Sequence, residues 1–276
     1  MKTLPVGVQV YSVRGDAEKD FAGTMKKIKE MGYDGVELAG LYGHTPEEVR
    51  DAIREAGLVA LSAHVPYVDL VADMEKTVSD YETIGCKFIA VPYLMPEYRP
   101  GTDAFPDVVK NIDAIGACCH RHGITLMYHN HDFEFQTKID GMYALDYLYK
   151  TIGPDHLQTE IDTCWVNVAG ENPAEYVRKY TGRAPIVHLK DFWKKEGNTG
   201  KMYELIGVKS EDGEEKKEKV FGFRPVGYGQ QDIPAILQAA IDAGAQWVVV
   251  EQDVSDERPP MEAIAMSRDY LKKQGW

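Results

Sequence analysis

The sequence predicts an α/β fold in which eight parallel strands close into one (β/α)8 barrel, a single domain over residues 1–276. The first observation is a unit that repeats along the chain. A stretch with helical periodicity ends at a glycine, and an apolar, strand-like run follows. Glycine adopts the left-handed conformation that commonly follows a helix. The glycines that mark these units are Gly32, Gly57, Gly85, Gly123, Gly153, Gly182 and Gly244.

The second observation is the number of strand candidates. Strict alternation of strands with helices indicates a parallel sheet, and eight such units favour closure into a barrel. An open, doubly wound sheet is the alternative. It usually carries a glycine-rich phosphate turn after its first strand, which "YSVRGDAEKD" at 11–20 does not resemble. The predicted strands are 6–13, 35–40, 58–65, 86–93, 124–131, 157–165, 185–191 and 247–253.

Helices between these strands show local signals of their own. Phe21, Met25 and Ile28 recur at the spacing of one amphipathic helix face. The segment "TPEEV" at 45–49 offers a threonine N-cap, a proline in the first turn and a glutamate that closes a capping box. Asn172 before Pro173 predicts another helix start of this kind.

The connection between the seventh and eighth strands is irregular. "KMYELIGV" at 201–208 and "KVFGF" at 219–223 flank a charged turn, which predicts a hairpin-like insertion at about 194–224. This connection belongs to the strand-to-helix end, where barrel active sites are built. We expect the insertion to cap the barrel mouth, with Trp193 or Arg224 close to a substrate. A solvated surface hairpin remains the alternative.

Composition and charge restrict the class of partner. The formal net charge of −13 disfavours a nucleic-acid partner, because phosphate backbones attract basic surfaces. The chain has neither an apolar run long enough for a membrane span nor a signal-peptide core at its start. Its four cysteines show no CxxC spacing. We therefore expect a cytoplasmic protein without a membrane partner, and leave a homo-oligomer or a second subunit open.

The third observation concerns the two faces of each predicted strand. One face is apolar, as contact with helices requires, whereas the other turns polar toward the carboxyl end. Burying ionisable groups is costly unless they pair or bind a metal. Each residue alone could be a hydrogen-bonded core residue, but together they predict a site at the barrel mouth. The polar-face residues include Gln9, Tyr11, Glu37, Ser62, His64, His129, His131, Glu160, Asp162, His188, Lys190, Glu251 and Asp253.

Histidine and carboxylate groups together indicate a divalent-metal site. The strongest ligand candidates come from the fifth to eighth strands: His129 or His131, then Asp162, His188 and Glu251. Mixed nitrogen and oxygen ligands suit Mn²⁺, Co²⁺, Fe²⁺ or Zn²⁺ better than Mg²⁺ or Ca²⁺. The chain has no HExxH helix, no P-loop lysine and no serine in a nucleophile elbow, which disfavours metalloprotease, nucleotide-binding and serine-hydrolase functions.

Motifs along nearly the whole chain make the sequence resemble the xylose isomerase-like TIM barrels, which include sugar isomerases, epimerases, inosose dehydratases and endonuclease IV. They are "GVQVYSVR", "GYDGVEL", "YHNHDFEF", "EIDTCWV", "VHLKD", "VGYGQQD" and "VVVEQD". The resemblance implies one metal, Mn²⁺ first, on Asp162, His188, Glu251 and a residue of the fifth strand. Many epimerases have glutamate at that strand, whereas this chain has His129. His131 is then expected beside it for substrate or proton transfer, or as the ligand in its place.

The resemblance implies an isomerase or epimerase that removes a proton next to the carbonyl of a sugar or keto-sugar. Alternatives are a lyase that eliminates water or an aglycone from a keto-sugar or keto-inositol, and a non-catalytic sugar-binding or partner-subunit barrel. Endonuclease IV-like cleavage is disfavoured by the acidic charge. The expected acid–base groups are His131, His64, Lys190, Glu160 and Glu37. The expected substrate-binding residues are Gln9, Tyr11, Trp193 and Arg224.

Overall fold

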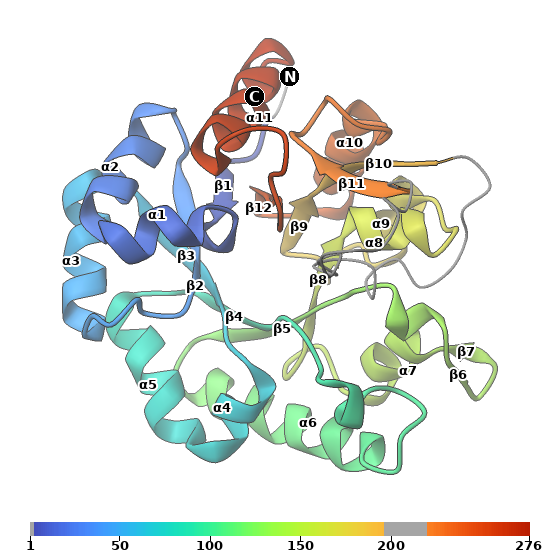
Figure 1. Cartoon of the computed structure of the whole chain (residues 1–276). Coiled ribbons are helices and arrows are strands. Elements are labelled where there is room, and N and C mark those ends of the chain that lie inside the picture. Colours follow the sequence, from blue (N-terminus) through green and yellow to red (C-terminus); the bar gives the residue numbers. More distant parts are fainter. Residues whose placement is uncertain (1–2, 196–219) are drawn as a thin grey trace, which may run out of the picture.

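A computed structural model describes residues 3–195 and 220–276. Eight parallel strands form a closed barrel, and helices surround it as an outer ring (Figure 1). No helix of the described residues is long and apolar enough to cross a membrane. The barrel strands are β1 (Val6–Gln9), β2 (Gly35–Ala39), β3 (Val59–His64), β4 (Phe88–Val91), β5 (Thr125–His129), β8 (Gln158–Asp162), β9 (Ile186–Leu189) and β12 (Trp247–Val250).

Each strand pairs with the next barrel strand along the chain, and β12 returns to pair with β1. This order confirms the (β/α)8 barrel and rules out the open doubly wound sheet. Eight predicted strands are present, but all are shorter than predicted. Residues 10–13 form a 3₁₀ turn after β1, and 163–165 begin a helix directly after β8. The sequence periodicity continues into both segments, which explains why these two strands were predicted too long.

Helices connect the strands and cover the barrel from outside. Three predicted helix signals are confirmed: the capping box between Thr45 and Glu48, the Asn172 N-cap and the buried stripe Phe21, Met25 and Ile28. The helices are α1 (Arg14–Lys19), α2 (Phe21–Glu30), α3 (Pro46–Ala56), α4 (Tyr67–Ala72), α5 (Met74–Ile84), α6 (Phe105–Arg121), α7 (Ala144–Thr151), α8 (Thr163–Val168), α9 (Pro173–Lys179), α10 (Ile233–Ala243) and α11 (Pro260–Lys273).

Six of the seven marker glycines have positive φ, in agreement with the predicted helix endings. Gly153 is the exception. The helix before it, α7, ends at Thr151 with an extended C-cap at Ile152, so no left-handed residue is needed there. The prediction of a glycine cap at that position was therefore wrong.

The barrel interior changes character along its axis, and this change positions the site. Its amino-terminal half is filled by apolar side chains, which form a packed layer as in other barrels of this type. These are Leu61, Phe88, Ala90, Met127, Ile186 and Val249. Above that layer the inward side chains are polar and buried. They include Gln9, Glu37, His64, His129, Glu160, Asp162, His188 and Glu251.

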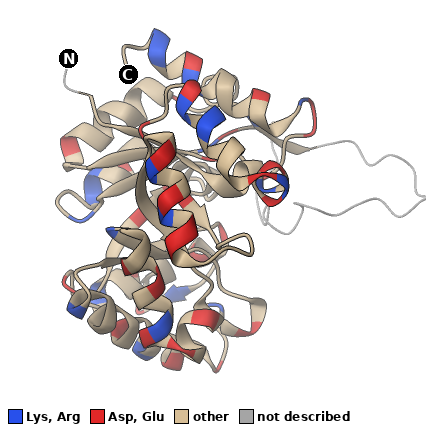
Figure 2. Cartoon of the chain, turned by 90° about the vertical axis from the view of Figure 1, so that its left-hand side faces the viewer, with Lys and Arg blue, Asp and Glu red and all other residues tan. Residues whose placement is uncertain are grey.

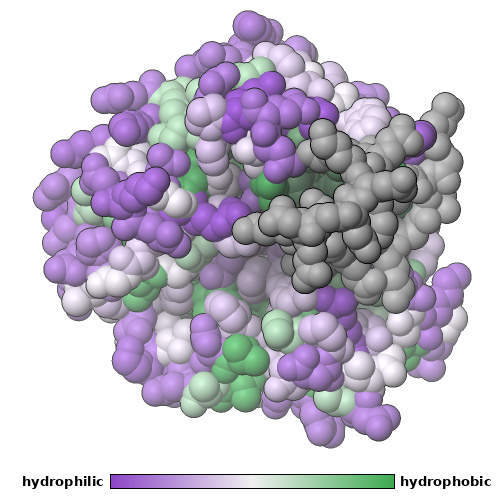
Figure 3. Space-filling model, viewed as in Figure 1, coloured by the Kyte–Doolittle hydropathy of each residue, from purple (hydrophilic) through white to green (hydrophobic). Residues whose placement is uncertain are grey.

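In Figure 2, acidic and basic residues are interspersed along the helices of one side of the molecule. In the space-filling view, one apolar group lies over α4, where Val68 and Val71 are exposed (Figure 3). All four cysteines are free and buried.

Two short strands extend from the end of β9 as an antiparallel ribbon. β10 (Asp191–Lys194) pairs with β11 (Phe221–Arg224), with Asp191 opposite Arg224. The base of the predicted hairpin is therefore present, although its first strand begins at the last residue of predicted strand 185–191. Residues 196–219 lie outside the described residues, and with them the "KMYELIGV" half of the hairpin. The capping role of this insertion stays a prediction. Two more short strands, β6 (Lys138–Ile139) and β7 (Met142–Tyr143), pair before α7.

Candidate metal centre at the barrel mouth

Four side chains at the carboxyl ends of β5, β8, β9 and β12 converge on one point. Each of His129, Asp162, His188 and Glu251 offers a ligand atom, and these atoms lie within 4.8 Å of one another. His129 Nε2 is 3.5 Å from Asp162 Oδ2 and 4.0 Å from Glu251 Oε2, and His188 Nδ1 is 3.0 Å from Glu251 Oε2. The residues predicted as metal ligands are thus brought together.

Asp162 shows how local folding orients a ligand. It is the N-cap of α8, and its Oδ1 accepts hydrogen bonds from the backbone N–H groups of Cys164 and Trp165 at 2.8 and 3.2 Å. Its other oxygen, Oδ2, is buried and takes no part in this cap. That oxygen has Lys190 Nζ at 3.0 Å. A carboxylate with one oxygen fixed and the other turned toward two imidazoles and a second carboxylate fits a divalent cation.

A second group lies deeper in the barrel and shares two histidines with the first. His64, His129, Glu160 and His188 also offer ligand atoms within 4.8 Å of one another. His64 Nε2 is 2.7 Å from Glu160 Oε2 and 3.1 Å from Glu37 Oε1. Glu37 Oε1 also lies 2.8 Å from His188 Nε2. Glu37 and Glu160 thus connect the histidines into one buried network.

Lys190 pairs with two of the predicted metal ligands, Asp162 and Glu251. Its Nζ is 3.0 Å from Asp162 Oδ2, 2.8 Å from Glu251 Oε2 and 3.0 Å from Asp253 Oδ1. The ammonium group also lies 5.5 Å from the ring centre of Trp165. Its side chain is buried, so the three carboxylates replace the water that a lysine normally needs.

The charges of the network are set by burial and by neighbouring groups. Burial, helped by His188 and His64, lowers the pKa of His129 well below its usual value, so this imidazole is neutral and suited to bind a metal. Burial acts the same way on His188, but Glu160 and Glu37 outweigh it and raise the pKa of His188 well above its usual value. A metal on His188 therefore has to displace a proton.

His131 was predicted to lie on the fifth strand, but it lies beyond the end of β5. The strand ends at His129, and the chain then turns through Asn130, so strand parity does not place the His131 ring. Its ring stacks on Phe133 with centroids 5.5 Å apart and lies 5.2 Å from the ring of His129. It also lies 5.6 Å from Trp165. Burial lowers the pKa of His131 well below its usual value, which keeps it neutral.

The four predicted substrate-binding residues lie in different surroundings. Gln9 is buried, and its Nε2 donates to Glu37 Oε1 at 2.9 Å. Tyr11 lies in the turn after β1 and is 42% exposed, so it does not share the Gln9 face. Trp193 is exposed on β10, and Arg224 forms an ion pair with Glu257 at 2.7 Å. A contact of these four with substrate remains a prediction.

Sequence reasoning assigned no role to four residues that the structure places in or beside the site. Asp253 pairs with Lys190, and its alternation with Glu251 was the available signal. Asn130 donates to the Asp162 carbonyl oxygen at 3.2 Å and accepts from its N–H at 2.9 Å. Trp165 contacts both His131 and Lys190. Asp191 accepts from four backbone N–H groups and fixes the following loop; nothing in the pattern distinguished it from a surface acid.

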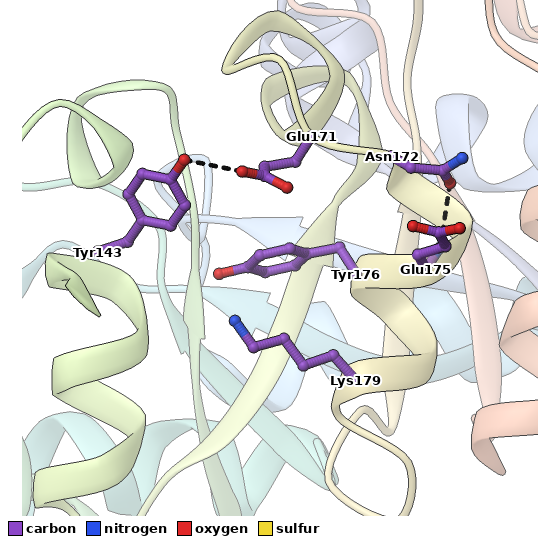
Figure 4. Close-up of a pocket in the computed structure, with 6 residues that line it drawn as sticks. All are labelled: Tyr143, Glu171, Asn172, Glu175, Tyr176 and Lys179. Atoms are coloured by element: carbon purple, nitrogen blue, oxygen red, sulfur yellow. Dashed lines mark hydrogen bonds between the residues drawn. The ribbon is translucent and has the colours of Figure 1, made fainter. Parts of the chain in front are cut away.

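A surface pocket of about 330 Å³ lies between β7 and α9 (Figure 4). Its polar groups are largely satisfied by one another: Tyr143 donates to Glu171 at 2.7 Å, and Asn172 accepts from the Glu175 N–H at 3.1 Å. Lys179 is paired with Asp146. None of the predicted metal ligands lines this pocket, so it is separate from the candidate centre.

Comparisons with known proteins agree with this fold. A curated inosose dehydratase from Mesomycoplasma hyopneumoniae is 22% identical, over 99% of this chain and 96% of that protein. A sugar phosphate isomerase/epimerase structure from Parabacteroides distasonis has a TM-score of 0.76 at 21% identity and covers 98% of each chain. A structure of the IOLI protein with a binding zinc atom has a TM-score of 0.70 at 14% identity, over 98% of this chain and 97% of that one.

These two structural likenesses are evidence for the fold alone. A family model described as xylose isomerase-like TIM barrel matches residues 25–274. The match covers most of the chain and contains all four predicted metal ligands. The chain therefore belongs to the xylose isomerase-like TIM barrel family.

Proposed function

We propose that this protein is a divalent-metal-dependent enzyme that removes a proton next to the carbonyl of a keto-sugar or keto-inositol. One observation carries the proposal: His129, Asp162, His188 and Glu251 offer four ligand atoms within 4.8 Å of one another at the barrel mouth. Two imidazoles and two carboxylates suit Mn²⁺, with Co²⁺, Zn²⁺, Fe²⁺ or Mg²⁺ as further choices. A bound divalent ion would polarise the substrate carbonyl and make the neighbouring C–H more acidic.

The chain supplies an acid and a base whose pKa values are shifted in opposite directions. Burial lowers the pKa of His131 and keeps its imidazole neutral, and a neutral imidazole can accept a proton. Burial also tends to lower the pKa of Lys190, but Asp162, Asp253 and Glu251 outweigh it and raise that pKa well above its usual value. Lys190 therefore holds its proton. Both side chains lie against Trp165, so they share one end of the site.

The large difference between the pKa values of His131 and Lys190 favours elimination over epimerisation. In a dehydration, His131 takes the proton from carbon, the C–H electron pair forms a carbon–carbon double bond, and the neighbouring C–O bond breaks. The departing hydroxide takes a proton from Lys190 and leaves as water. Epimerisation instead needs two groups that exchange the acid and base roles, and groups of very different pKa do this poorly. His129, in place of a carboxylate, removes one further candidate for that exchange.

Two curated relatives support the same choice. The proteins from Mesomycoplasma hyopneumoniae and Clostridium perfringens are both named inosose dehydratase and align with nearly the whole chain. Isomerase or epimerase activity on a sugar, the first expectation from the sequence, is the second candidate. Proteins named sugar phosphate isomerase/epimerase and L-ribulose 3-epimerase share this fold. His64 and Glu160, joined at 2.7 Å, would then be the second acid–base pair.

The test uses purified protein with Mn²⁺ and a keto-inositol in D₂O. We expect a product lighter than the substrate by one water, and deuterium at the carbon next to the carbonyl in recovered substrate. A product of unchanged mass that carries deuterium would select the isomerase or epimerase. A product that retains the substrate hydrogen would indicate a hydride shift and exclude His131 as base. A protein that neither binds metal nor responds to EDTA would be a non-catalytic barrel.

A further inference from the structure

A second group of metal-ligating side chains lies outside the barrel, between α5 and the end of α6. Glu75, Cys118 and His122 each offer a ligand atom, and these atoms lie within 4.8 Å of one another. Glu75 is on α5, whereas Cys118 and His122 are four residues apart at the end of α6, which packs against α5. None of the three belongs to the network at the barrel mouth.

The surroundings orient these groups toward a common point. His122 Nε2 lies 3.0 Å from Glu75 Oε2, while its Nδ1 lies 2.7 Å from Glu82 Oε2. The other oxygen of Glu75 is paired with Arg121. At protein metal sites, one ring nitrogen of a histidine usually binds the metal, while a carboxylate holds the other. Cys118 is fully buried, whereas Glu75 is exposed and His122 partly exposed, which leaves a path for an ion.

We propose that Glu75, Cys118 and His122 form a Zn²⁺ site on the outer helices, with Glu82 as the carboxylate that orients His122. Thiolate, imidazole and carboxylate are all zinc ligands, and three protein ligands leave a fourth position for water. The thiolate separates this site from the barrel mouth, whose predicted ligands are nitrogen and oxygen only. A bound ion would join α5 to α6 and stabilise their packing. The inference does not depend on the proposed function.

Zn²⁺ binding at this site requires the release of protons. Glu82 and Glu75 raise the pKa of His122, and burial together with Glu75 raises the pKa of the Cys118 thiol. Protons therefore compete with a metal ion for both ligands. On binding, the thiol proton passes to solvent and a Zn–S bond replaces the S–H bond.

Cobalt titration of the full-length protein tests the assignment directly. Co²⁺ replaces Zn²⁺, and a thiolate ligand gives it a sulfur-to-metal charge-transfer band in the near ultraviolet. We expect this band in the wild type, its loss in Cys118→Ala, and its retention in Cys119→Ala. Cys119 is the matched control, because it is adjacent in sequence and equally buried but is not grouped with Glu75 and His122. Absence of the band in the wild type, or its persistence in Cys118→Ala, would overturn the proposal.

Surface variants keep the test valid if Cys118→Ala does not fold. Glu82→Gln should weaken binding of the band-forming Co²⁺ about 10–100-fold, the usual effect of removing such a carboxylate. His122→Ala should abolish the band, whereas His120→Ala, an exposed histidine on the same helix, should not. Zn²⁺ stoichiometry should fall by one ion per chain in His122→Ala. A wild type that binds one ion, and loses it on Asp162→Asn, would place all the metal at the barrel mouth.

Discussion

Asp162 is the single residue on which the barrel site depends most, because its two oxygens have different partners. Oδ1 caps α8, and Oδ2 faces His129 and Lys190. Asp162→Asn keeps an oxygen for the cap but places a neutral amide at the metal position. We therefore expect Asp162→Asn to remain folded and to lose the ion at the barrel mouth, measured by elemental analysis. The same loss is expected in Asp162→Ala and His188→Ala. Wild-type metal content in these variants would remove both residues from the ligand set.

His131 is the proposed base of the barrel site. Its ring lies between Phe133, Trp165 and His129 and is neutral because burial lowers its pKa. A positioned base contributes about 10²–10⁴-fold to rate, so His131→Ala should lower kcat by that factor while metal content stays unchanged. Steady-state kinetics with metal analysis on the same sample checks both parts. Loss of metal instead would make His131 the ligand in place of His129.

The sequence predicted the identity of the inward residues better than their geometry. Strand parity correctly brought together Glu37, His129, Asp162 and His188, because alternation within a barrel strand leaves no other inward choice. His131 lies beyond the end of its strand, so parity does not determine where its ring points. Trp165 lies on a helix that begins directly after β8, and only the folded chain brings it to His131 and Lys190.

The carboxylate of Asp191 holds the loop that follows the β10–β11 ribbon. Asp191 accepts hydrogen bonds from the N–H groups of Phe192, Gly227, Gly229 and Gln231, at 2.9, 2.9, 2.9 and 3.1 Å. Gly229 has no room for a side chain, since an added Cβ would lie 2.2 Å from Asp191 Oδ1. The motif "VGYGQQD" is therefore a structural partner of Asp191.

Asp191→Ala should leave those four donors without their acceptor. A hydrogen bond to a charged group contributes about 1.5–3 kcal/mol, so we expect a loss of roughly 3 kcal/mol in the free energy of unfolding. Denaturant unfolding measures it, and Asp191→Asn should recover part of the loss because its amide oxygen still accepts. Asp232→Ala, which removes only the N-cap of α10, is a milder control of about 1 kcal/mol. Equal losses in the two alanine variants would contradict this role.

The turn after β5 contains a carboxyl group that makes stability depend on pH. Burial raises the pKa of Glu134 to about 7, although Tyr128 OH and the His131 N–H donate to it at 2.6 and 2.8 Å. Between pH 4.5, its ordinary pKa, and pH 7 the group is ionised only in the unfolded chain. Unfolding therefore becomes easier as the pH rises through that window, by on the order of 3 kcal/mol in total.

Glu134→Gln tests this, because the amide keeps the shape and cannot ionise. The difference in unfolding free energy between wild type and Glu134→Gln should move in favour of the variant from pH 4.5 to 7 and then level off. Urea unfolding at a series of pH values measures it. A difference that stays constant over this range would show that Glu134 is ionised in the folded protein.

At the scale of the whole molecule, the repeat and alternation predicted the barrel, its strand order and its polar end. Local patterns do not fix strand ends, because β1 passes into a 3₁₀ turn and β8 into a helix without a change in apolar periodicity. Nor do they fix register, which here sets Asp162 beside His188 and His129 beside Glu160. Convergence of four strands is a property of the closed barrel, and only closure gives the ligand distances.

Closure also connects metal binding to the stability of the whole fold. The predicted ligands come from β5, β8, β9 and β12, so an ion would bind the closed barrel and not the unfolded chain. Saturation at 100 times Kd then stabilises the fold by about 2.7 kcal/mol. For a chain of this size each kcal/mol raises Tm by roughly 2–4 °C.

We therefore expect Mn²⁺ to raise the Tm of the EDTA-treated protein by roughly 5–10 °C in calorimetry. This figure multiplies the stabilisation at 100 times Kd by the rise in Tm per kcal/mol. Mn²⁺ is the ion of choice here because it prefers oxygen and imidazole ligands to thiolate, so Glu75, Cys118 and His122 contribute little. Asp162→Asn should abolish the rise, and Cys118→Ala should leave it intact. An equal rise in Asp162→Asn would mean that Mn²⁺ stabilises the protein from a site other than the barrel mouth.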